Sequence, residues 1–466
     1  MSAVVESSAR PLPLVAMADP ARPFAWRGGR CIDLDAFLAD VDALAARLPS
    51  GRDVVNLGDD RYAFMVAFCA IALRGRCNLL PPSRAPLAVA EALAAYPGSY
   101  ALDGSDTAAL AVPRRSPPRR RLRSTRAGIP ASQLVAIGFT SGSTGQPRPN
   151  PKSWGSFHAS SARNVAALAQ LIGLAPGTLA HIVATVPPQH MYGIELSILL
   201  PLLGPFAVHS GQPLFPADVA AALAQVPAPR VLVTTPVHLR ALLRDPQSLP
   251  PLAAITSATA PLPQELAAEA EARYGAPVLE LFGSTETCVI AQRRSAHEAD
   301  WRLMPDVELR PQPDGTLVDA PYFVQPVVLP DVVELLPERR FRLCGRHADL
   351  VDIAGKRASL ADLTRRVLAL DGVEDAVVLQ LDEADASGVR RIAALVVAPA
   401  RTEAGLVEEL RRAIDPAFLP RPLRRVAALP RNDTGKLPRA ALLAALRGAP
   451  REPPDGSEDL LEPRLS

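Results

Sequence analysis

Residues 134–148, LVAIGFTSGSTGQPR, are the stretch on which the interpretation of this sequence depends. Its first six residues read as a buried strand, and the next six, TSGSTG, hold four hydroxyl residues and two glycines. A flexible turn after a strand can aim backbone N–H groups and hydroxyls at an anion such as a phosphate. No lysine follows the second glycine, so the run is not a GxxxxGK[ST] loop. The alternative at this point is a surface linker.

Short apolar strands alternate with helical or loop segments around this stretch. Helical periodicity is clear in residues 34–48 and 61–73. The strands are VVNL, CNLL, HIVATV, RVLVTT, LAAITS and VLELFG, at residues 54–57, 77–80, 181–186, 230–235, 252–257 and 278–283. Such alternation predicts an α/β fold with mostly parallel sheets.

A second, smaller domain is predicted after residue 346. The pattern there changes to a helix, two strands, a helix and a last strand, at residues 360–370, 375–381, 391–398, 403–414 and 425–429. This pattern is typical of a small α+β domain. We therefore predict domains at 1–346 and 347–447, followed by a disordered tail at 448–466, which is rich in Pro, Glu and Asp.

Composition narrows the class of protein. The 466 residues are 48% hydrophobic and 21% charged with a net charge of +2, which argues against a dedicated nucleic-acid binder. Five scattered cysteines without a CxxC pair and a start without a signal-peptide pattern favour the cytoplasm. Residues 164–194 carry no Asp, Glu, Lys or Arg, but their prolines and glycines indicate buried helix, loop and strand, not a membrane span. The arginine run at 114–126 reads as a solvated loop, with a nucleic-acid or membrane patch as the alternative.

Lysine is almost absent, since only three of the 50 basic residues are lysines: Lys152, Lys356 and Lys436. Arginine supplies a solvated charge equally well, whereas a compact ammonium that must reach one reacting oxygen cannot be replaced by a planar guanidinium. The three lysines are therefore candidate functional residues, with chance survival as the alternative.

The run FTSGSTGQPR resembles the phosphate loop of the adenylate-forming superfamily, which includes acyl-CoA and aryl-CoA ligases, peptide-synthetase adenylation domains and luciferase-type enzymes. Further motifs similar to those of the superfamily follow in its order: PPQHMYG at 187–193, ITSATAPLPQEL at 255–266, LFGSTET at 281–287, Asp331 with Gly345 and Arg346, and LPRNDTGKLPR at 429–439. The resemblance spans roughly residues 30–445. It implies a large N-terminal AMP-binding domain of several subdomains and a small mobile C-terminal domain that carries a catalytic lysine.

The resemblance also implies roles for individual residues. The expected phosphate-binding residues are Thr140, Ser141, Gly142, Ser143, Thr144, Gly145, Arg148 and Lys152. Those expected at adenine and ribose are Ala258, Thr259, Ala260, Phe282, Gly283, Asp331 and Arg346. His190, Tyr192 and Gly193 are expected in the acyl pocket, Gly355 and Lys356 in the thiol channel, and Lys436, Thr285 and Glu286 in catalysis, with Glu286 as the Mg²⁺ ligand.

The chemistry of these residue types agrees with those roles. A carboxylate and a hydroxyl at the carboxyl edge of a sheet suit Mg²⁺ and a phosphate oxygen, although Thr285 and Glu286 alone could be a helix cap. Asp331 offers two acceptor oxygens to the ribose hydroxyls, with a surface salt bridge as the plain alternative for Arg346. An ammonium at Lys436 can bridge a carboxylate and the α-phosphate, unless it is an ordinary exposed lysine.

Three departures from the superfamily pattern leave questions open. Arg148 stands where the superfamily usually has lysine, and Lys152 follows four residues later, so either one could serve the phosphates. Ala348 occupies the hinge position, and Leu329 with Pro330 replaces the usual Thr-Gly before the ribose-binding Asp.

The implied reaction activates a carboxylic acid, aryl or medium-chain acyl, with ATP and Mg²⁺ to an acyl-adenylate and pyrophosphate. Transfer to the thiol of CoA, or to the phosphopantetheine of an acyl carrier protein, then releases AMP. The alternatives are a non-catalytic nucleotide-binding homologue that acts as an interaction protein, and an RNA- or membrane-associated protein that uses the arginine run.

Overall fold

The structure is a computed structural model that describes residues 11–50, 53–81, 84–104, 128–141, 147–312, 315–323, 325–346, 350–353, 356–384, 390–432 and 435–448. The chain divides into two compact units, Met1–Leu343 and Cys344–Ser466. The predicted boundary was residue 346. The predicted tail beyond Gly448, the arginine run at 114–126 and the hinge residue Ala348 lie outside the described residues.

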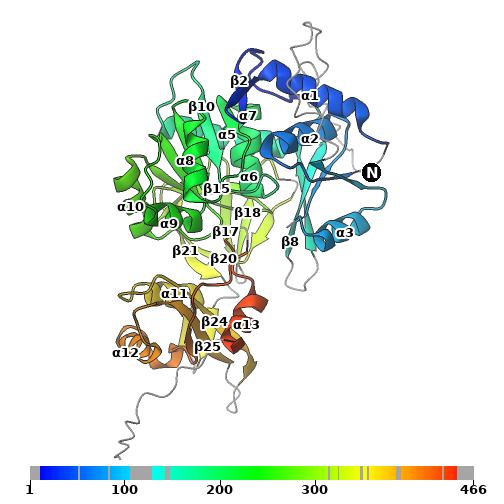
Figure 1. Ribbon diagram of the computed structural model, residues 1–466. Coiled ribbons are helices and arrows are strands. Elements are labelled where there is room, and N and C mark those ends of the chain that lie inside the picture. Colours follow the sequence, from blue (N-terminus) through cyan, green and yellow to red (C-terminus); the bar gives the residue numbers. More distant parts are fainter. Residues whose placement is uncertain are drawn as a thin grey trace, which may run out of the picture. The chain divides into compact units, whose positions relative to one another are not determined.

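The first unit is built on an eleven-stranded sheet with a parallel centre (Figure 1). Its order is β20-β21-β16-β15-β14-β13-β12-β10-β11-β2-β3, and every pair from β14 to β2 is parallel. The parallel strands are β2 (Pro23–Arg27), β10 (Ala180–Ala184), β11 (Phe206–His209), β12 (Arg230–Thr234), β13 (Ala254–Ser257) and β14 (Val278–Ser284). The outer strands are β3 (Arg30–Asp33), β15 (Cys288–Arg293), β16 (Trp301–Leu303), β20 (Asp331–Leu336) and β21 (Arg340–Arg346).

Helices cover both faces of the parallel centre. Along β10 and β12, Val183 and Leu232 pack into one apolar cluster, whereas their neighbours Ile182 and Val231 pack into another. Successive strand residues point to opposite faces, so this alternation shows that both faces are buried. One face is covered by α8 (Pro216–Ala224), α9 (Pro236–Arg244) and α10 (Gln264–Tyr274), and the other by α2 (Arg61–Leu73), α5 (Trp154–Leu171) and the π-helix η2 (Glu195–Leu199).

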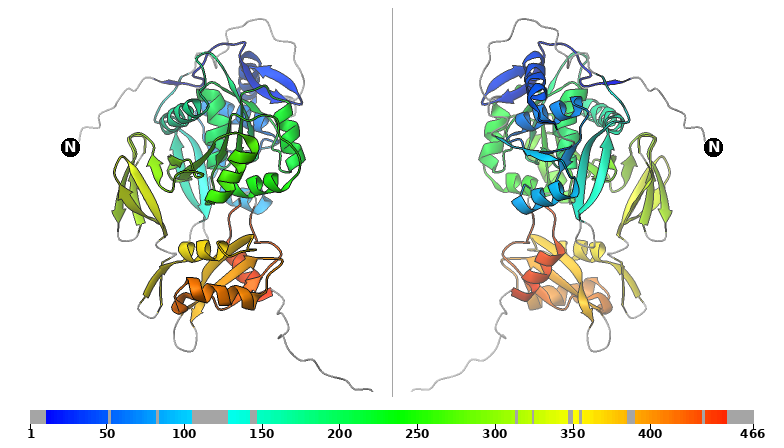
Figure 2. Two further views of the ribbon diagram at one scale, coloured as in Figure 1. Left: turned by 90° about the vertical axis from the view of Figure 1, so that its left-hand side faces the viewer. Right: turned by 90° about the vertical axis from the view of Figure 1, so that its right-hand side faces the viewer.

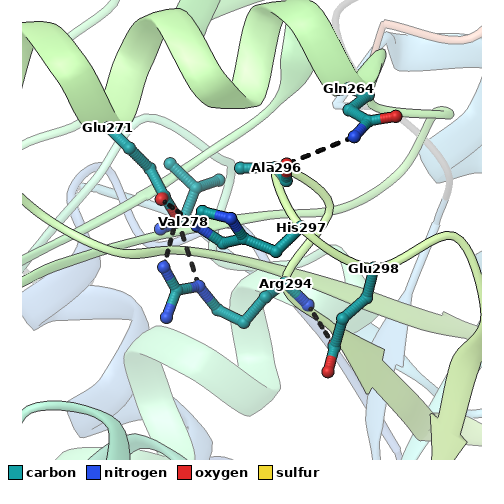
Figure 3. A network of polar contacts seen from close by, with 7 residues as sticks. All are labelled: Gln264, Glu271, Val278, Arg294, Ala296, His297 and Glu298. Atoms are coloured by element: carbon teal, nitrogen blue, oxygen red, sulfur yellow. Dashed lines mark hydrogen bonds and ion pairs between the residues drawn. The ribbon is translucent and has the colours of Figure 1, made fainter.

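A polar network ties α10 to the loop after β15 (Figure 3). Glu271 of α10 accepts hydrogen bonds from the Val278 amide at 2.7 Å, from Arg294 at 2.7 Å and from His297 at 2.8 Å. Burial alone would raise the pKa of Glu271, but these donors outweigh burial and hold the pKa below its ordinary value. The network therefore fixes the start of β14, the end opposite the predicted site.

A second sheet of the first unit has the order β6-β4-β5-β8-β9. Its strands are β4 (Val54–Asn56), β5 (Asn78–Leu80), β6 (Tyr100–Leu102), β8 (Leu134–Ser141) and β9 (Pro147–Ser153), and α3 (Pro86–Ala95) packs on β4 and β6. The helix α1 (Leu34–Arg47) packs instead on α2, β2 and β3. A third sheet, antiparallel and seen at the side of this unit in Figure 2, consists of β17 (Glu308–Gln312), β18 (Gly315–Asp319) and β19 (Val327–Leu329). Finally, β1 (Leu12–Pro13) pairs with β7 (Gly128–Ile129).

The described part of the second unit holds its own apolar core. Its strands are β22 (Leu350–Ile353), β23 (Lys356–Ser359), β24 (Asp375–Ala384), β25 (Arg390–Val397) and β26 (Leu423–Arg425). Its helices are α11 (Leu360–Leu368), α12 (Glu403–Ala413) and α13 (Arg439–Gly448). Val367, Val396 and Leu410 are completely buried in this core.

The predicted α/β fold is confirmed, and the predicted strands of the parallel sheets all form. The strand predicted at 425–429 is wrong, because β26 spans Leu423–Arg425. Val426 N still donates to the Val396 carbonyl at 2.9 Å, and the chain then bends away at residues 427–428. Leu429 instead packs in a cluster with Leu442 of α13. Residues 164–194 form the end of α5, β10 and α6 (Met191–Ile194), as predicted, and no described helix is both long and apolar enough to cross a membrane.

Candidate active site

The predicted phosphate loop joins two paired strands. β8 and β9 are antiparallel, and the register places Thr140 opposite Arg148 and Ser141 opposite Pro147. Gly142, Ser143, Thr144 and Gly145 lie outside the described residues, and the side chains of Thr140 and Ser141 are not described either. Arg148 is exposed where β9 begins. The strands on either side of the hydroxyl-rich run therefore pair with each other in one sheet and are not separate elements.

The strand that leads into this loop packs directly on Thr285. A Cβ atom placed on Gly138 of β8 would lie 2.7 Å from Cγ2 of Thr285 and 3.5 Å from Cε of Met191. Real Cβ atoms do not approach so closely, so only glycine lets Thr285 lie here. Residues of two motifs that are 147 positions apart in the sequence, Gly138 and Thr285, are thus in contact.

Thr285 and Glu286 lie in a tight turn between β14 and β15. Ser284 N donates to Thr287 Oγ1 at 3.2 Å, and Thr287 N donates back to Ser284 Oγ at 3.3 Å. Cys288 has a φ of 62°, and a Cβ on Gly283 would lie 2.2 Å from the Cys288 carbonyl oxygen. The expected nucleotide-binding Gly283 is therefore required by the backbone of this turn.

Lys152 reaches the same turn from β9. Its side chain is 7% exposed, and its Nζ donates a hydrogen bond to the backbone carbonyl of Glu286. The other candidate cation, Arg148, is exposed in the same strand. The two cations expected near the phosphates therefore lie in different environments, one buried and one open to solvent.

Glu195 lies behind the turn and was not predicted from the sequence. The side chain is 1% exposed, and its Oε2 accepts from Val289 N at 3.0 Å. Its Oε1 accepts from Asn164 at 3.1 Å and from Ser160. Burial raises the pKa of Glu195 to about 7, although these donors and the charge of Lys152 act in the opposite direction.

The predicted acyl-pocket residues lie at the start of α6. His190 is the residue before its first turn, and Tyr192 is buried with its Oη 2.9 Å from Oγ1 of Thr256 in β13. A Cβ on Gly193 would lie 2.0 Å from the carbonyl oxygen of Pro187, so the loop packs tightly on this helix. Met191 contacts the turn after β14, with its Sδ 3.8 Å from Cys288 Sγ. α6 therefore adjoins Thr285.

The predicted adenine side is formed by the loop after β13 and by Phe282. Thr259, between Ala258 and Ala260, has a φ of 79°, a conformation that a β-branched residue rarely adopts and that glycine adopts readily. The ring of Phe282 lies 5.3 Å from Trp301 and 5.9 Å from Phe341, measured between centroids. The Phe282 ring thus packs in an aromatic cluster with Trp301 and Phe341.

The remaining predicted residues are distributed over both units. Asp331 begins β20, and its carbonyl accepts from Thr316 Oγ1 at 2.6 Å. Arg346 ends β21 and Lys356 begins β23, but their side chains are not described, and Gly355 lies outside the described residues.

Lys436 follows a turn whose backbone is pinned. Its N–H donates to Asn432 Oδ1 at 2.9 Å, and Gly435 has a φ of 79°. Arg431 donates to the Gly435 carbonyl at 3.0 Å and also binds Asp375 through a 2.8 Å ion pair. The side chain of Lys436 is exposed. The structure therefore presents an open ammonium on a restrained turn.

Comparison with known proteins identifies the family of this chain. The model of the AMP-binding enzyme family matches residues 85–318. The chain belongs to the AMP-binding enzyme family. The matched residues of this AMP-binding enzyme include the β8–β9 hairpin, α6, the loop after β13 and the Thr285–Glu286 turn, so the resemblance inferred from the motifs is confirmed.

Similar proteins fit this AMP-binding assignment. The chain is 32% identical over 305 residues to a 4-coumarate–CoA ligase of Rhodobacter capsulatus, covering 65% of this chain and 74% of that protein. It is 31% identical over 321 residues to a 4-coumarate–CoA ligase of Halorhodospira halophila, covering 64% and 73%. The fold is similar to that of ATP-bound MatB from Rhodopseudomonas palustris, with a TM-score of 0.74, 19% identity and coverage of 93% and 97%.

Proposed function

We propose that this AMP-binding enzyme activates a carboxylic acid with ATP and transfers the acyl group to a thiol. In the first step a carboxylate oxygen attacks the α-phosphorus of ATP, and the bond to pyrophosphate breaks. In the second step a thiol sulfur attacks the acyl carbon, and AMP leaves as a thioester forms. The observation that carries this proposal is the contact of Thr285 with Gly138, which joins the phosphate hairpin to the Thr285–Glu286 turn.

The residues of the chain would act mainly by binding and charge stabilisation. Arg148 is exposed opposite Thr140 across the hairpin, where a guanidinium can hold phosphate oxygens. The Thr285 hydroxyl would donate to an α-phosphate oxygen, and Lys436 would bridge the attacking carboxylate and that phosphate. His190 and Tyr192 would form a wall of the acyl pocket, with no proton transfer assigned to His190.

A divalent metal fits the turn only together with ATP. In the described part of the chain no three His, Cys, Asp or Glu side chains gather into a metal site. Mg²⁺ is commonly held by one or two carboxylates plus substrate phosphates, so Glu286 beside the phosphate hairpin is a suitable single protein ligand. When bound, Mg²⁺ would neutralise charge on the phosphates. Glu286 would orient the metal from a turn that Lys152 holds through the backbone carbonyl of Glu286.

We propose an aryl acid as the substrate and CoA as the acceptor. The name of the two curated relatives, 4-coumarate–CoA ligase, supports both assignments. The hydroxyls of Tyr192 and Thr256, which lie 2.9 Å apart, would give the proposed acyl pocket a polar edge. A medium-chain acyl acid and the phosphopantetheine of a carrier protein are the alternatives to be compared.

The test is acid-dependent exchange of labelled pyrophosphate into ATP, over a panel of aryl and alkyl acids. We expect exchange with at least one aryl acid and, on addition of CoA, a thioester and AMP. The second reaction is repeated with a phosphopantetheine-loaded carrier protein in place of CoA. Absence of exchange with every acid, together with retained ATP binding, would support a non-catalytic nucleotide-binding homologue.

A further inference from the structure

The Thr285–Glu286 turn is held from two sides by charged side chains that come from distant parts of the chain. Lys152, 134 residues earlier, binds the carbonyl of Glu286 at one end of the turn. Glu195, 94 residues before its partner, binds the amide of Val289 at the other end. Between these two anchors lie Thr287, which is completely buried, and Cys288.

Both ionisable side chains are removed from water, so each needs hydrogen-bond partners within the protein. Lys152 is 7% exposed and Glu195 is 1% exposed. A buried charge is tolerated when it is hydrogen-bonded and balanced by an opposite charge. The ammonium of Lys152 acts in that direction by favouring the ionised form of Glu195, although burial outweighs it.

Glu195 also needs both of its oxygens. Oε2 accepts from Val289 N, while Oε1 accepts from Asn164 and Ser160 of α5. A glutamine can keep its oxygen on Val289 N and present its NH₂ group to α5, but Ser160 must then accept instead of donate and Asn164 must turn its amide. The carboxylate therefore links the turn to α5 without the rearrangement of Ser160 and Asn164 that its amide isostere requires.

We propose that Lys152 and Glu195 are positioning residues that clamp the turn carrying Thr285 and Glu286. Lys152 acts through the Glu286 carbonyl, and the phosphates are left to Arg148. The clamp joins β9 of the phosphate hairpin, η2 beside the acyl-side helix α6, and the turn after β14. It rests on the proposed function, because its purpose is to hold Thr285 and Glu286 for ATP.

The experiment compares Lys152→Met, Glu195→Gln and the double variant, with Glu271→Gln as the matched control. Glu271 also accepts a hydrogen bond from a backbone amide of β14, that of Val278, and forms an ion pair with Arg294, but at the opposite end of the strand. We expect Lys152→Met to lower kcat about a hundredfold and to raise KM for Mg-ATP about tenfold, because a small displacement of reacting groups is costly. KM for the acid should change by less than about twofold in this variant.

The double variant separates positioning from folding. Each single variant leaves one buried group uncompensated, whereas the double variant removes both charges and should recover most of the thermal stability. Activity should stay low in the double variant, because nothing holds the Glu286 carbonyl. Activity that returns together with stability would overturn the clamp, as would single variants whose KM for Mg-ATP changes no more than in Glu271→Gln.

Amide hydrogen exchange gives a readout that needs no activity. Lys152→Met should speed exchange in a peptide covering residues 281–290 while leaving the start of β14 protected, and Glu271→Gln should show the reverse. Unchanged protection of 281–290 in Lys152→Met would refute the clamp, whatever the activity. A wild-type chain that exchanges no pyrophosphate with any acid would instead refute the proposed function, and the clamp would then be judged by protection alone.

Discussion

At the scale of single residues, Glu195 shows how a fold can bury an ionisable group that is by itself more stable in water. It follows a 31-residue stretch without Asp, Glu, Lys or Arg and begins the apolar run ELSILLPLL. An isolated carboxylate in such a run is a signal that the sequence contained, since burying it requires dedicated partners. The structure supplies these partners from α5, β15 and β9.

The raised pKa of Glu195 leads to a prediction about stability and pH. Its pKa rises from 4.5 to about 7 on folding, because burial disfavours the charged form. The folded state therefore holds the proton of Glu195 more tightly than the unfolded state does. The contribution of Glu195 to the free energy of unfolding accordingly falls by about 3 kcal/mol as the pH rises from about 4.5 to about 7. Glu195→Gln should abolish this part of the slope in urea unfolding measured across that range.

Glu271→Gln provides the control, because the pKa of Glu271 is lowered on folding. The contribution of Glu271 to the free energy of unfolding is present above its unfolded-state pKa and is lost as the pH falls. Glu271→Gln should therefore change the slope of that free energy against pH in the opposite direction. A pH slope in Glu195→Gln that equals the wild-type slope would show that Glu195 is not held as a proton-binding group.

Lys436 carries a prediction about the two half-reactions. Its exposed ammonium stands on a turn pinned by Asn432 and Arg431, so Lys436→Ala should remove one charge with little structural change. We expect adenylate formation to fall about a hundredfold to a thousandfold, as when one transition-state donor is lost. Thiol transfer from preformed adenylate should stay close to the wild-type rate.

Both half-reactions are measured separately, by pyrophosphate exchange and by single-turnover thioester formation. Arg447→Ala removes another exposed charge of the second unit and should leave both rates unchanged. Equal losses in the two half-reactions of Lys436→Ala would remove its assignment to adenylate formation.

At the scale of elements, the close packing of β8 on the turn after β14 gives a prediction with a built-in rescue. A Cβ on Gly138 would lie 2.7 Å from Cγ2 of Thr285, so Gly138→Ala should displace Thr285 and lower kcat about a hundredfold. Thr285→Ser lacks that methyl group and keeps the hydroxyl. The double variant Gly138→Ala, Thr285→Ser should therefore regain most of the activity in the exchange assay.

Gly138→Ala and Thr285→Ser change the same contact, the one between residue 138 and the Cγ2 methyl group of Thr285, so the double variant tests that contact directly. If the double variant stays as inactive as Gly138→Ala alone, the methyl contact is not what positions Thr285. Thr285→Ser by itself serves as the reference, since it keeps the donor group proposed to bind the phosphate.

Element boundaries could be predicted where local patterns decide them. The helix at 61–73 coincides with α2, because Asp60 caps it and the apolar run after the cap is long enough for a helix buried on all sides. The last strand was misplaced, since which residues form it depends on the register with its distant partner β25. The strands β17, β18 and β19 were not predicted, as their pairing is set by neighbours and not by a strong local pattern.

At the scale of the whole molecule, each unit has its own apolar core. In the first unit, Leu232 is completely buried between the sheet and α8–α10, and in the second unit Leu410 is completely buried between α12 and the sheet. We expect units with separate cores to unfold in separate transitions, so that two free energies of unfolding are needed to describe the chain.

Matched core substitutions test this separation. Leu410→Ala should destabilise the second unit by about 3 kcal/mol and shift only one calorimetric transition. Leu232→Ala should shift only the other transition by a comparable amount. A single transition that moves equally in both variants would show that the units unfold together.

The sequence by itself determined the fold class, the order of the motifs and the family, because strand alternation, turn residues and motif spacing are local properties of the chain. It also singled out Lys152 and Arg148, but it did not distinguish their surroundings. Only the tertiary structure decided that Lys152 is buried against the Glu286 carbonyl and that Glu195 holds Val289. Burial and pairing of charges depend on segments 134 and 94 residues apart, and packing, not local sequence, brings those segments together.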